Sequence, residues 1–139
     1  MITISSKSRY AVQALAELAR QGALPGGQPV PIAELARRRE IPLQFLEQLF
    51  ATLRRAGLLK SQRGVKGGYV FERDPSEVSV LEIVQLLDGQ FDAEAAVAGG
   101  TNEVWSTAVA ALRKVLSDTS IADVLQQEAK DAGAQMYHI

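Results

Sequence analysis

The chain has 139 residues, of which 47% are hydrophobic and 22% are charged, and its formal net charge is −1. This is the composition of an ordinary globular protein, and no run of about 18 apolar residues exists that could cross a membrane. The sequence has no cysteine, which excludes disulfides, thiolate catalysis and cysteine-ligated clusters. The first residues lack the apolar core of a secretion signal, so the expected location is cytoplasmic.

The small net charge hides an asymmetry between the two halves of the chain. Residues 1–73 hold twelve Lys and Arg against five Asp and Glu, whereas residues 74–139 hold three against eleven. The first half is therefore net +7 and the second half net −8. A basic front and an acidic back indicate that only the front meets a polyanion, although two solvated faces would give the same count.

The first predicted helix starts at Ser5 or Ser6 and runs to about Gln21, with an apolar stripe along one side. Its first turns contain Lys7, Arg9 and Tyr10. Cations at this end oppose the helix dipole, so they are candidates for contacts to phosphates, with simple solvation as the alternative.

Two closely spaced helices follow, at about residues 32–39 and from Pro42 to about residue 56. Glu40 and Ile41 form the turn between them, and Pro42 suits the first position of the second helix. That helix has an apolar stripe, and its other face carries Gln44, Glu47 and Gln48. The pair predicts a helix-turn-helix, with Arg37, Arg38 and Arg39 beside the DNA backbone or in water.

A basic hairpin comes directly after the helix-turn-helix. Residues 58–63 and 69–73 read as short strands, and the glycine-rich residues 64–68 between them can form a tight turn. An amphipathic helix followed by such a hairpin is typical of a winged helix-turn-helix. In that fold the helix enters the major groove of DNA and the hairpin lies along the backbone or the minor groove.

The rest of the chain predicts three further helices. Ser79 and Glu82 form a capping-box pattern at the start of a helix over residues 80–88, which ends at Gly89. Residues 90–103 read as a loop or short helix. The next helix, about 102–116, is apolar on more than one side, so it needs covering on two faces. Ser120 caps the last helix. We therefore divide the chain into a DNA-binding domain, 1–89, and a region of linker, dimerisation helix and tail, 90–139.

The local sequence resembles the Rrf-two family of bacterial winged-helix transcription regulators over essentially the whole chain. The strongest matches are SSKSRYAV, FLEQLFATLRRAGLLKSQRG, GGYVF and VLEIVQLLDG. The resemblance implies a mainly α fold with a small β-hairpin wing, and a homodimer that binds a partly palindromic operator in double-stranded DNA. The implied role is regulation of transcription, most often repression.

The resemblance also nominates site residues, carried over position by position. Gln44, Glu47 and Gln48 would contact base edges. The wing would contact DNA through Ser61, Arg63, Gly64, Lys66, Gly67 and Gly68. The start of the first helix would contact phosphates through Lys7, Arg9 and Tyr10. The resemblance also implies that the long helix holds the dimer. The two-sided apolar pattern of that helix, rather than the resemblance, selects Val104, Trp105, Ala108, Leu112, Val115 and Leu116 for the contact.

The chemistry of these side chains agrees with that assignment. Gln can bond both N6 and N7 of adenine, Glu can accept from cytosine N4, and Arg63 at a glycine-flanked tip can enter a narrow minor groove. Glu47 has an alternative role, because a carboxylate near phosphates is normally repelled. It could instead pair with Arg54 or Arg55 on its own helix.

The sequence departs from the family in one respect. Many members hold an iron–sulfur cluster through cysteines, and the matching stretch, residues 91–103, has none. His138 is the single histidine and cannot form a metal site alone. No cofactor is therefore expected. In its missing cluster motif and in its tail the chain resembles the cluster-free, CymR-like branch, which acts in cysteine metabolism.

Resemblance to that branch implies one further partner. The sequence ends in Tyr137-His138-Ile139, and a terminal isoleucine offers a carboxylate and a branched side chain that the active site of cysteine synthase could accept. The alternative is a tail that packs on its own dimer. The competing function for the whole chain is a protein-interaction module that no longer binds DNA. An enzyme is not expected, because no nucleophile and base can be paired.

Overall fold

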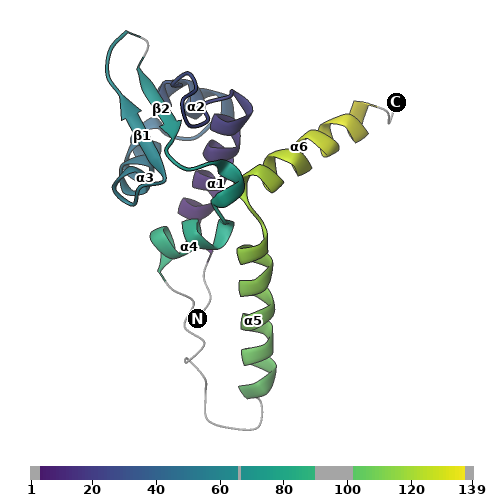
Figure 1. Cartoon of the computed structure of the whole chain (residues 1–139). Helices are drawn as coiled ribbons and strands as arrows, with labels where there is room; N and C mark the ends of the chain where they lie inside the picture. The colour runs from purple at the N-terminus through teal and green to yellow at the C-terminus, as the bar shows by residue number, and fades with distance from the viewer. Residues whose placement is uncertain (1–3, 66, 90–101, 137–139) are drawn as a thin grey trace.

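The structure, a computed structural model, describes residues 4–65, 67–89 and 102–136. It is mainly helical with one two-stranded antiparallel hairpin, as the sequence predicted (Figure 1). No helix among the described residues is long and apolar enough to cross a membrane. In chain order the elements are α1 (Ser6–Arg20), α2 (Ile32–Arg39), α3 (Leu43–Arg55), β1 (Leu59–Gln62), β2 (Gly68–Phe71), the short 3-10 helix η1 (Pro75–Glu77), α4 (Val80–Asp88), α5 (Asn102–Asp118) and α6 (Ile121–Met136).

Helix α1 is the centre of the fold and packs against α2, α3, α4 and α6. Ser5 caps its start by accepting a hydrogen bond from the Lys7 amide at 3.2 Å, and the chain leaves the helix through Gly22 at φ +80°. The expected stripe is buried, but the helix is covered on more than one side, since Glu17 is also buried. The main core gathers around it, with Leu15, Leu18, Phe50 and Phe71 fully enclosed.

The helix-turn-helix forms as expected, except that its second helix begins one residue later than predicted. Glu40 takes a left-handed conformation at φ +54°, and Ile41 is buried in the core. Pro42 is the cap residue rather than the first helical residue, which is Leu43. A one-residue difference at a helix end does not change which face of α3 is buried.

The hairpin pairs Ser61 with Tyr69 and Gln62 with Gly68. Val30 extends this small sheet, because its amide and carbonyl both bond Tyr69, at 3.0 and 2.9 Å. The segment that enters α2 therefore also braces the wing.

The start of α4 and the start of α6 lie at one place in the fold. The backbone bridge Ser79–Ser120 pairs the residues before α4 with those before α6, through bonds of 2.8 and 2.9 Å. Helix α5 packs on α4 through a second, smaller core around Leu81 and Val84. Helix α6 then turns away from α5 and packs on α1 (Figure 1).

The capping of α4 differs in part from the prediction, whereas Ser120 caps α6 as predicted. Ser79 accepts from the Glu82 amide at 3.1 Å, but the Glu82 carboxylate accepts from Arg73 at 2.6 Å, so only half of the expected capping box forms. At α6 the reciprocal box is complete, because the Ser120 amide donates to Asp123 and the Asp123 amide donates to the Ser120 hydroxyl.

Candidate nucleic-acid interface

Helix α3 presents a polar face to solvent and buries the opposite one. Leu46, Leu49, Phe50 and Leu53 are buried, as their spacing predicted. Gln44, Glu47 and Gln48 are all exposed. Arg55, which was not nominated, follows Gln44 and Gln48 at helical spacing on the same stripe, and its guanidinium donates to the Thr52 hydroxyl at 3.3 Å.

Two aromatic contacts hold α3 in position. Tyr10 of α1 meets Phe45 edge to face at 5.7 Å between ring centroids, and Phe50 meets Tyr69 of the wing at 5.1 Å. Tyr10 is half-buried at this contact. The Tyr10 ring therefore helps to hold α3 against α1.

The wing is shaped by its glycines. Gly64 has φ +115°, and a Cβ on Gly67 would lie 2.4 Å from the Gln62 carbonyl oxygen. A Cβ on Gly68 would lie 2.3 Å from the backbone of Val30. These three positions act through their backbone, whereas the exposed Ser61 and Arg63 offer side chains to a ligand. Lys66 lies outside the described residues.

Glu47 is exposed and forms no ion pair with a side chain in the described part of the molecule. The alternative role, pairing with Arg54 or Arg55, is not seen in this structure. Its carboxylate is free to face a ligand on the same side as Gln48.

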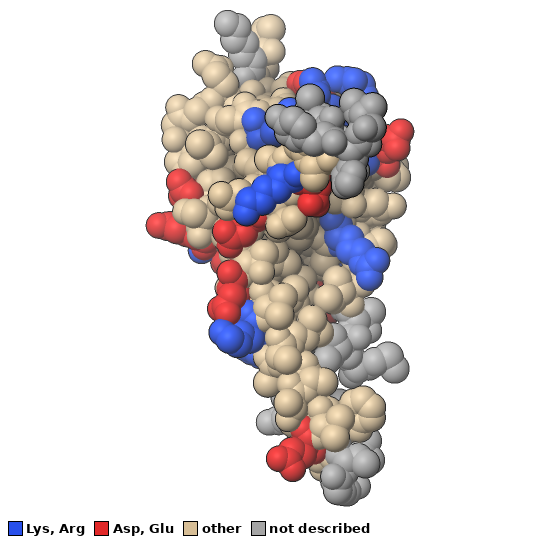
Figure 2. Space-filling model, turned by 90° about the vertical axis from the view of Figure 1, so that its right-hand side faces the viewer, with Lys and Arg blue, Asp and Glu red and all other residues tan. Residues whose placement is uncertain are grey.

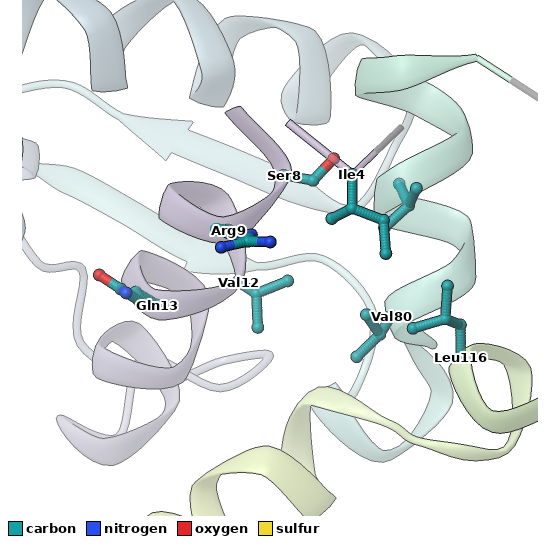
Figure 3. A pocket seen from close by; sticks show the side chains of 8 residues that line it. Ile4, Ser8, Arg9, Val12, Gln13, Val80 and Leu116 are labelled. Atoms are coloured by element: carbon teal, nitrogen blue, oxygen red, sulfur yellow. The ribbon is translucent and has the colours of Figure 1, made fainter. Parts of the chain in front are cut away.

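The three nominated residues of α1 lie on different sides of that helix. Tyr10 faces α3, whereas Arg9 lines a hollow of about 300 Å³ together with Val12, Val80 and Leu116 (Figure 3). Lys7 is exposed beside Asp88, whose negative charge it faces. The structure therefore does not gather Lys7, Arg9 and Tyr10 into one patch, and their contact with phosphates stays a prediction.

Asp88, the last residue of α4, contacts the start of α1, and the sequence analysis did not predict this contact. It accepts hydrogen bonds from the Ser5 amide at 2.9 Å, from the Ser5 hydroxyl, and from the buried Ser8 hydroxyl at 2.6 Å. Burial raises the pKa of Asp88, but the bonds from Ser5 and Ser8 outweigh burial and hold the pKa below its usual value. The last residue of α4 thus places a negative charge at the positive end of α1.

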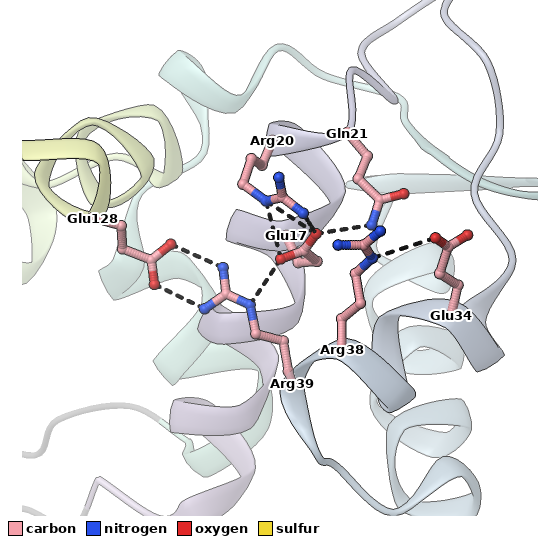
Figure 4. A network of polar contacts seen from close by, with 7 residues as sticks. All are labelled: Glu17, Arg20, Gln21, Glu34, Arg38, Arg39 and Glu128. Atoms are coloured by element: carbon pink, nitrogen blue, oxygen red, sulfur yellow. Dashed lines mark hydrogen bonds and ion pairs between the residues drawn. The ribbon is translucent and has the colours of Figure 1, made fainter. Parts of the chain in front are cut away.

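Arg39 corrects the expectation that all three arginines of α2 face DNA or water. Its Nε donates to Glu17 at 3.1 Å, and its two terminal nitrogens donate to Glu128 of α6 at 2.8 and 2.9 Å (Figure 4). Arg38 instead pairs with Glu34 of its own helix at 3.4 Å. The sequence could not show this, because Glu17 and Glu128 are 22 and 89 positions away from Arg39.

Glu17 is the buried acid at the centre of this network. It also accepts from Gln21 at 2.8 Å and from Arg20. Burial raises the pKa of Glu17, but the bonds from Arg20, Gln21 and Arg39 outweigh burial and lower the pKa to about 2. The carboxylate is therefore charged at neutral pH and joins α1 to α2, and Arg39 extends the network to α6.

Helix α5 has no fully buried residue among its seventeen. Leu112 and Leu116, nominated for dimerisation, lie half-buried against α4 of their own chain. Val104, Trp105, Ala108 and Val115 are exposed. Much of the lower part of the molecule, where α5 lies, is uncharged on the face shown in Figure 2.

A metal-binding cluster is not found in the described residues, where no three His, Cys, Asp or Glu side chains lie close enough to hold an ion. The stretch expected to form the linker, up to residue 101, lies outside the described residues, as do Tyr137, His138 and Ile139. Since the sequence contains no cysteine, the chain lacks the thiolates that a cysteine-ligated iron–sulfur cluster needs.

An exposed polar helix after a tight turn, next to a braced basic hairpin, defines a winged helix-turn-helix protein of the DNA-binding class. The family of Rrf2 regulators, described as iron-dependent transcriptional regulators, matches residues 4–127. The chain belongs to this family. Its relatives are regulators of transcription rather than enzymes, as expected.

Three relatives illustrate the match. The regulator IscR of Cereibacter sphaeroides is 34% identical, over 94% of this chain and 92% of that protein. IscR of Escherichia coli is 41% identical, but the match spans 65% of this chain and only 54% of that protein. The solved structure of CymR, the global cysteine regulator of B. subtilis, has a TM-score of 0.80 and 31% identity, and the match covers 91% of this chain and 98% of CymR.

Proposed function

We propose that this Rrf2 regulator works as a homodimer that represses transcription by binding a partly palindromic operator. One observation carries the proposal: the polar face of α3 and the arginine-bearing wing are both exposed, and the contact between Phe50 and Tyr69 links the two elements. A rigid pair of this kind can dock in adjacent grooves without a further ordering cost.

The chemistry of the exposed side chains assigns their roles. Gln44 and Gln48 can each bond adenine in the major groove, and Glu47 can accept from cytosine N4. Arg63 extends from the wing, where the negative potential of a narrow minor groove attracts a guanidinium. Lys7 and Arg9 would contribute phosphate contacts on either flank of α1.

The dimer is supported by a pattern on α5. Val104, Ala108, Ala111 and Val115 form one exposed apolar stripe at spacings of four, three and four residues. These spacings are the same from either end, as a two-fold contact between identical antiparallel helices requires. Val104 of one chain then faces Val115 of the other, and the alanines let the helices approach closely at the centre. Such a dimer sets two recognition helices roughly 34 Å apart, or a multiple of that distance.

The proposal also covers the signal to which the regulator responds. A chain without cysteine cannot sense through a cysteine-ligated cluster or a thiol, so its signal is a small molecule or another protein. The structural similarity to CymR, named as a global cysteine regulator, favours genes of cysteine and sulfur metabolism. On this reading cysteine synthase is the candidate partner, with Tyr137 and Ile139 as the residues it would bind.

The deciding experiment is a gel shift with DNA from upstream of the protein's own gene, comparing the wild type with Arg63→Ala. We expect Arg63→Ala to weaken binding by roughly 1–3 kcal/mol, because it removes a groove contact. Arg113→Ala, an exposed arginine on α5, is the matched control for loss of one positive charge. If the wild type bound no DNA in this assay or in selection from random sequence, the interaction-module alternative would replace this proposal.

A further inference from the structure

We infer that Val65, the apolar residue at the tip of the wing, enters the minor groove of DNA and packs against the deoxyriboses that line the groove. The inference rests on the proposed function and adds a contact that charge and hydrogen bonding do not supply. It starts from the exposure of this side chain. Val65 is wholly exposed, at 107%, whereas the next most exposed large hydrophobic residues among those described, Val104 and Val115, are 61% exposed.

The fold makes no use of this side chain, yet the backbone around it is tightly specified. The Gly67 amide donates to the Gly64 carbonyl at 2.9 Å, which closes a turn with Val65 at its first central position. Gly64 at φ +115° and the crowding at Gly67 and Gly68 require glycine at all three places. The sequence therefore builds a specific turn and places a branched apolar residue on it.

The turn is carried on a stiff base. Gly68 packs directly on the Val30–Pro31 backbone, Tyr69 exchanges two backbone bonds with Val30, and the Tyr69 ring packs on Phe50 of α3. The position of Val65 is thus tied to that of the recognition helix. An apolar tip held in this way loses little conformational freedom when it is buried in a complex.

The dimensions suit the minor groove. Ser61 pairs with Tyr69 at the braced base, and the three residues from there to Gly64 extend the hairpin by at most roughly 10 Å, at about 3.3 Å per residue. The minor groove is about 7.5 Å deep and about 6 Å wide, which a small branched side chain can enter. Minor-groove proteins commonly insert apolar side chains beside the arginines that read the groove, and Arg63 lies two residues away.

Affinity and its salt dependence together test this role. The probe is a DNA duplex selected from random sequence by the wild-type protein, and binding is measured at several salt concentrations. Val65→Thr keeps the branched shape but adds a hydroxyl, and Val65→Ile keeps the apolar character. We expect Val65→Thr and Val65→Ala to weaken binding roughly three- to tenfold, because apolar burial is lost. Val65→Ile should bind like the wild type.

The salt slope separates this contact from an ionic one. Val65→Thr should lower affinity equally at every salt concentration, because an apolar contact releases no counterions, whereas Arg63→Ala should also reduce the slope. All Val65 variants should unfold at the wild-type temperature, since the side chain is wholly exposed. Wild-type affinity in both Val65→Thr and Val65→Ala would overturn the inference, and selection of no duplex by the wild type would overturn the proposed function itself.

The groove can be located directly, because the chain has no cysteine. Val65→Cys is labelled with an iron chelate that releases hydroxyl radicals, and cleavage of the selected duplex is mapped on both strands. We expect paired cuts offset in the 3′ direction, the pattern of a radical source in the minor groove. Lys130→Cys on the exposed side of α6 is the matched control and should give no localised cuts. Cuts offset in the 5′ direction, or none at Val65→Cys, would contradict the inference.

Discussion

Arg39 and Glu128 form a two-bond ion pair, with nitrogen–oxygen distances of 2.8 and 2.9 Å, across 89 positions of sequence. Arg39 is the last residue of α2, and Glu128 lies in the middle of α6. The same guanidinium reaches the buried Glu17 of α1. One side chain therefore fixes the first helix of the helix-turn-helix to the C-terminal helix.

The first prediction concerns the strength of this link. Arg39→Met should destabilise the fold by roughly 1–3 kcal/mol, because Glu17 loses one of its buried partners. Glu128→Gln should cost less, about 0.5–1 kcal/mol, since its side chain is 39% exposed and the pair is screened by water. Urea unfolding of both single variants and the double variant measures the coupling. Strictly additive losses would show that the pair contributes nothing beyond its separate residues.

Glu17 gives a prediction for acid stability. Its pKa in the folded protein is about 2, against an ordinary value of 4.5, so folding favours the charged form. This contribution is complete above pH 4.5 and is lost as the pH falls from there toward 2, amounting to roughly 3 kcal/mol in all. Glu17→Gln should therefore be less stable at pH 7 and should lose less stability than the wild type between pH 5 and 2. Parallel acid-unfolding curves for the two proteins would contradict this assignment.

Gln48 should affect sequence preference more than overall affinity. Gln48→Ala is expected to cost on the order of 1–3 kcal/mol on the selected site, because a bidentate contact to one base is removed. The loss should be confined to one position in each half-site when single base changes are scanned. The unfolding temperature of Gln48→Ala, compared with that of the wild type, checks the stability of the helix separately. A uniform loss across all positions would mean that Gln48 supports the helix rather than reads a base.

The dimer interface on α5 can be tested by placing single cysteines in this cysteine-free chain. When Val104→Cys and Val115→Cys proteins are mixed and oxidised, the mixed pair should form a disulfide, because an antiparallel two-fold contact sets these positions opposite each other. Each protein alone should remain uncrosslinked. Crosslinking of Val104→Cys with itself would indicate parallel helices, and a monomeric mass in light scattering would rule out the dimer.

The family is described as iron-dependent, whereas this chain has no cysteine, and the iron content of the protein tests this difference. We expect anaerobically purified protein to be colourless, with no acid-labile sulfide, because no thiolate is available to hold a cluster. Elemental analysis and an absorption spectrum of the full chain measure this directly. Iron and sulfide near one equivalent per chain would require ligands that the sequence pattern does not indicate.

Local patterns predicted most of the fold. The apolar stripe of α3, the glycine-tipped wing and the cap at Ser79 each depend on residues close together in the sequence, and each forms. Long-range polar partners were beyond such reasoning. Nothing near Glu17 shows that it is buried, and nothing near Asp88 shows that it caps a helix eighty positions earlier. The same limit explains Arg39, whose place in a run of three arginines indicated exposure.

The bridge between Ser79 and Ser120 has a consequence for how the chain can vary. The chain between these two residues starts and ends at the same point of the fold, with α4 packed on α1 and α3 and with α5 packed on α4. In general, doubling the length of a loop between two fixed ends costs only about 0.6 kcal/mol. Changes in the length or the residues of the segment between α4 and α5 therefore need not disturb α3, the wing or the packing of α6 on α1. A cofactor-holding loop and one without cysteine can therefore be exchanged on the same DNA-reading half.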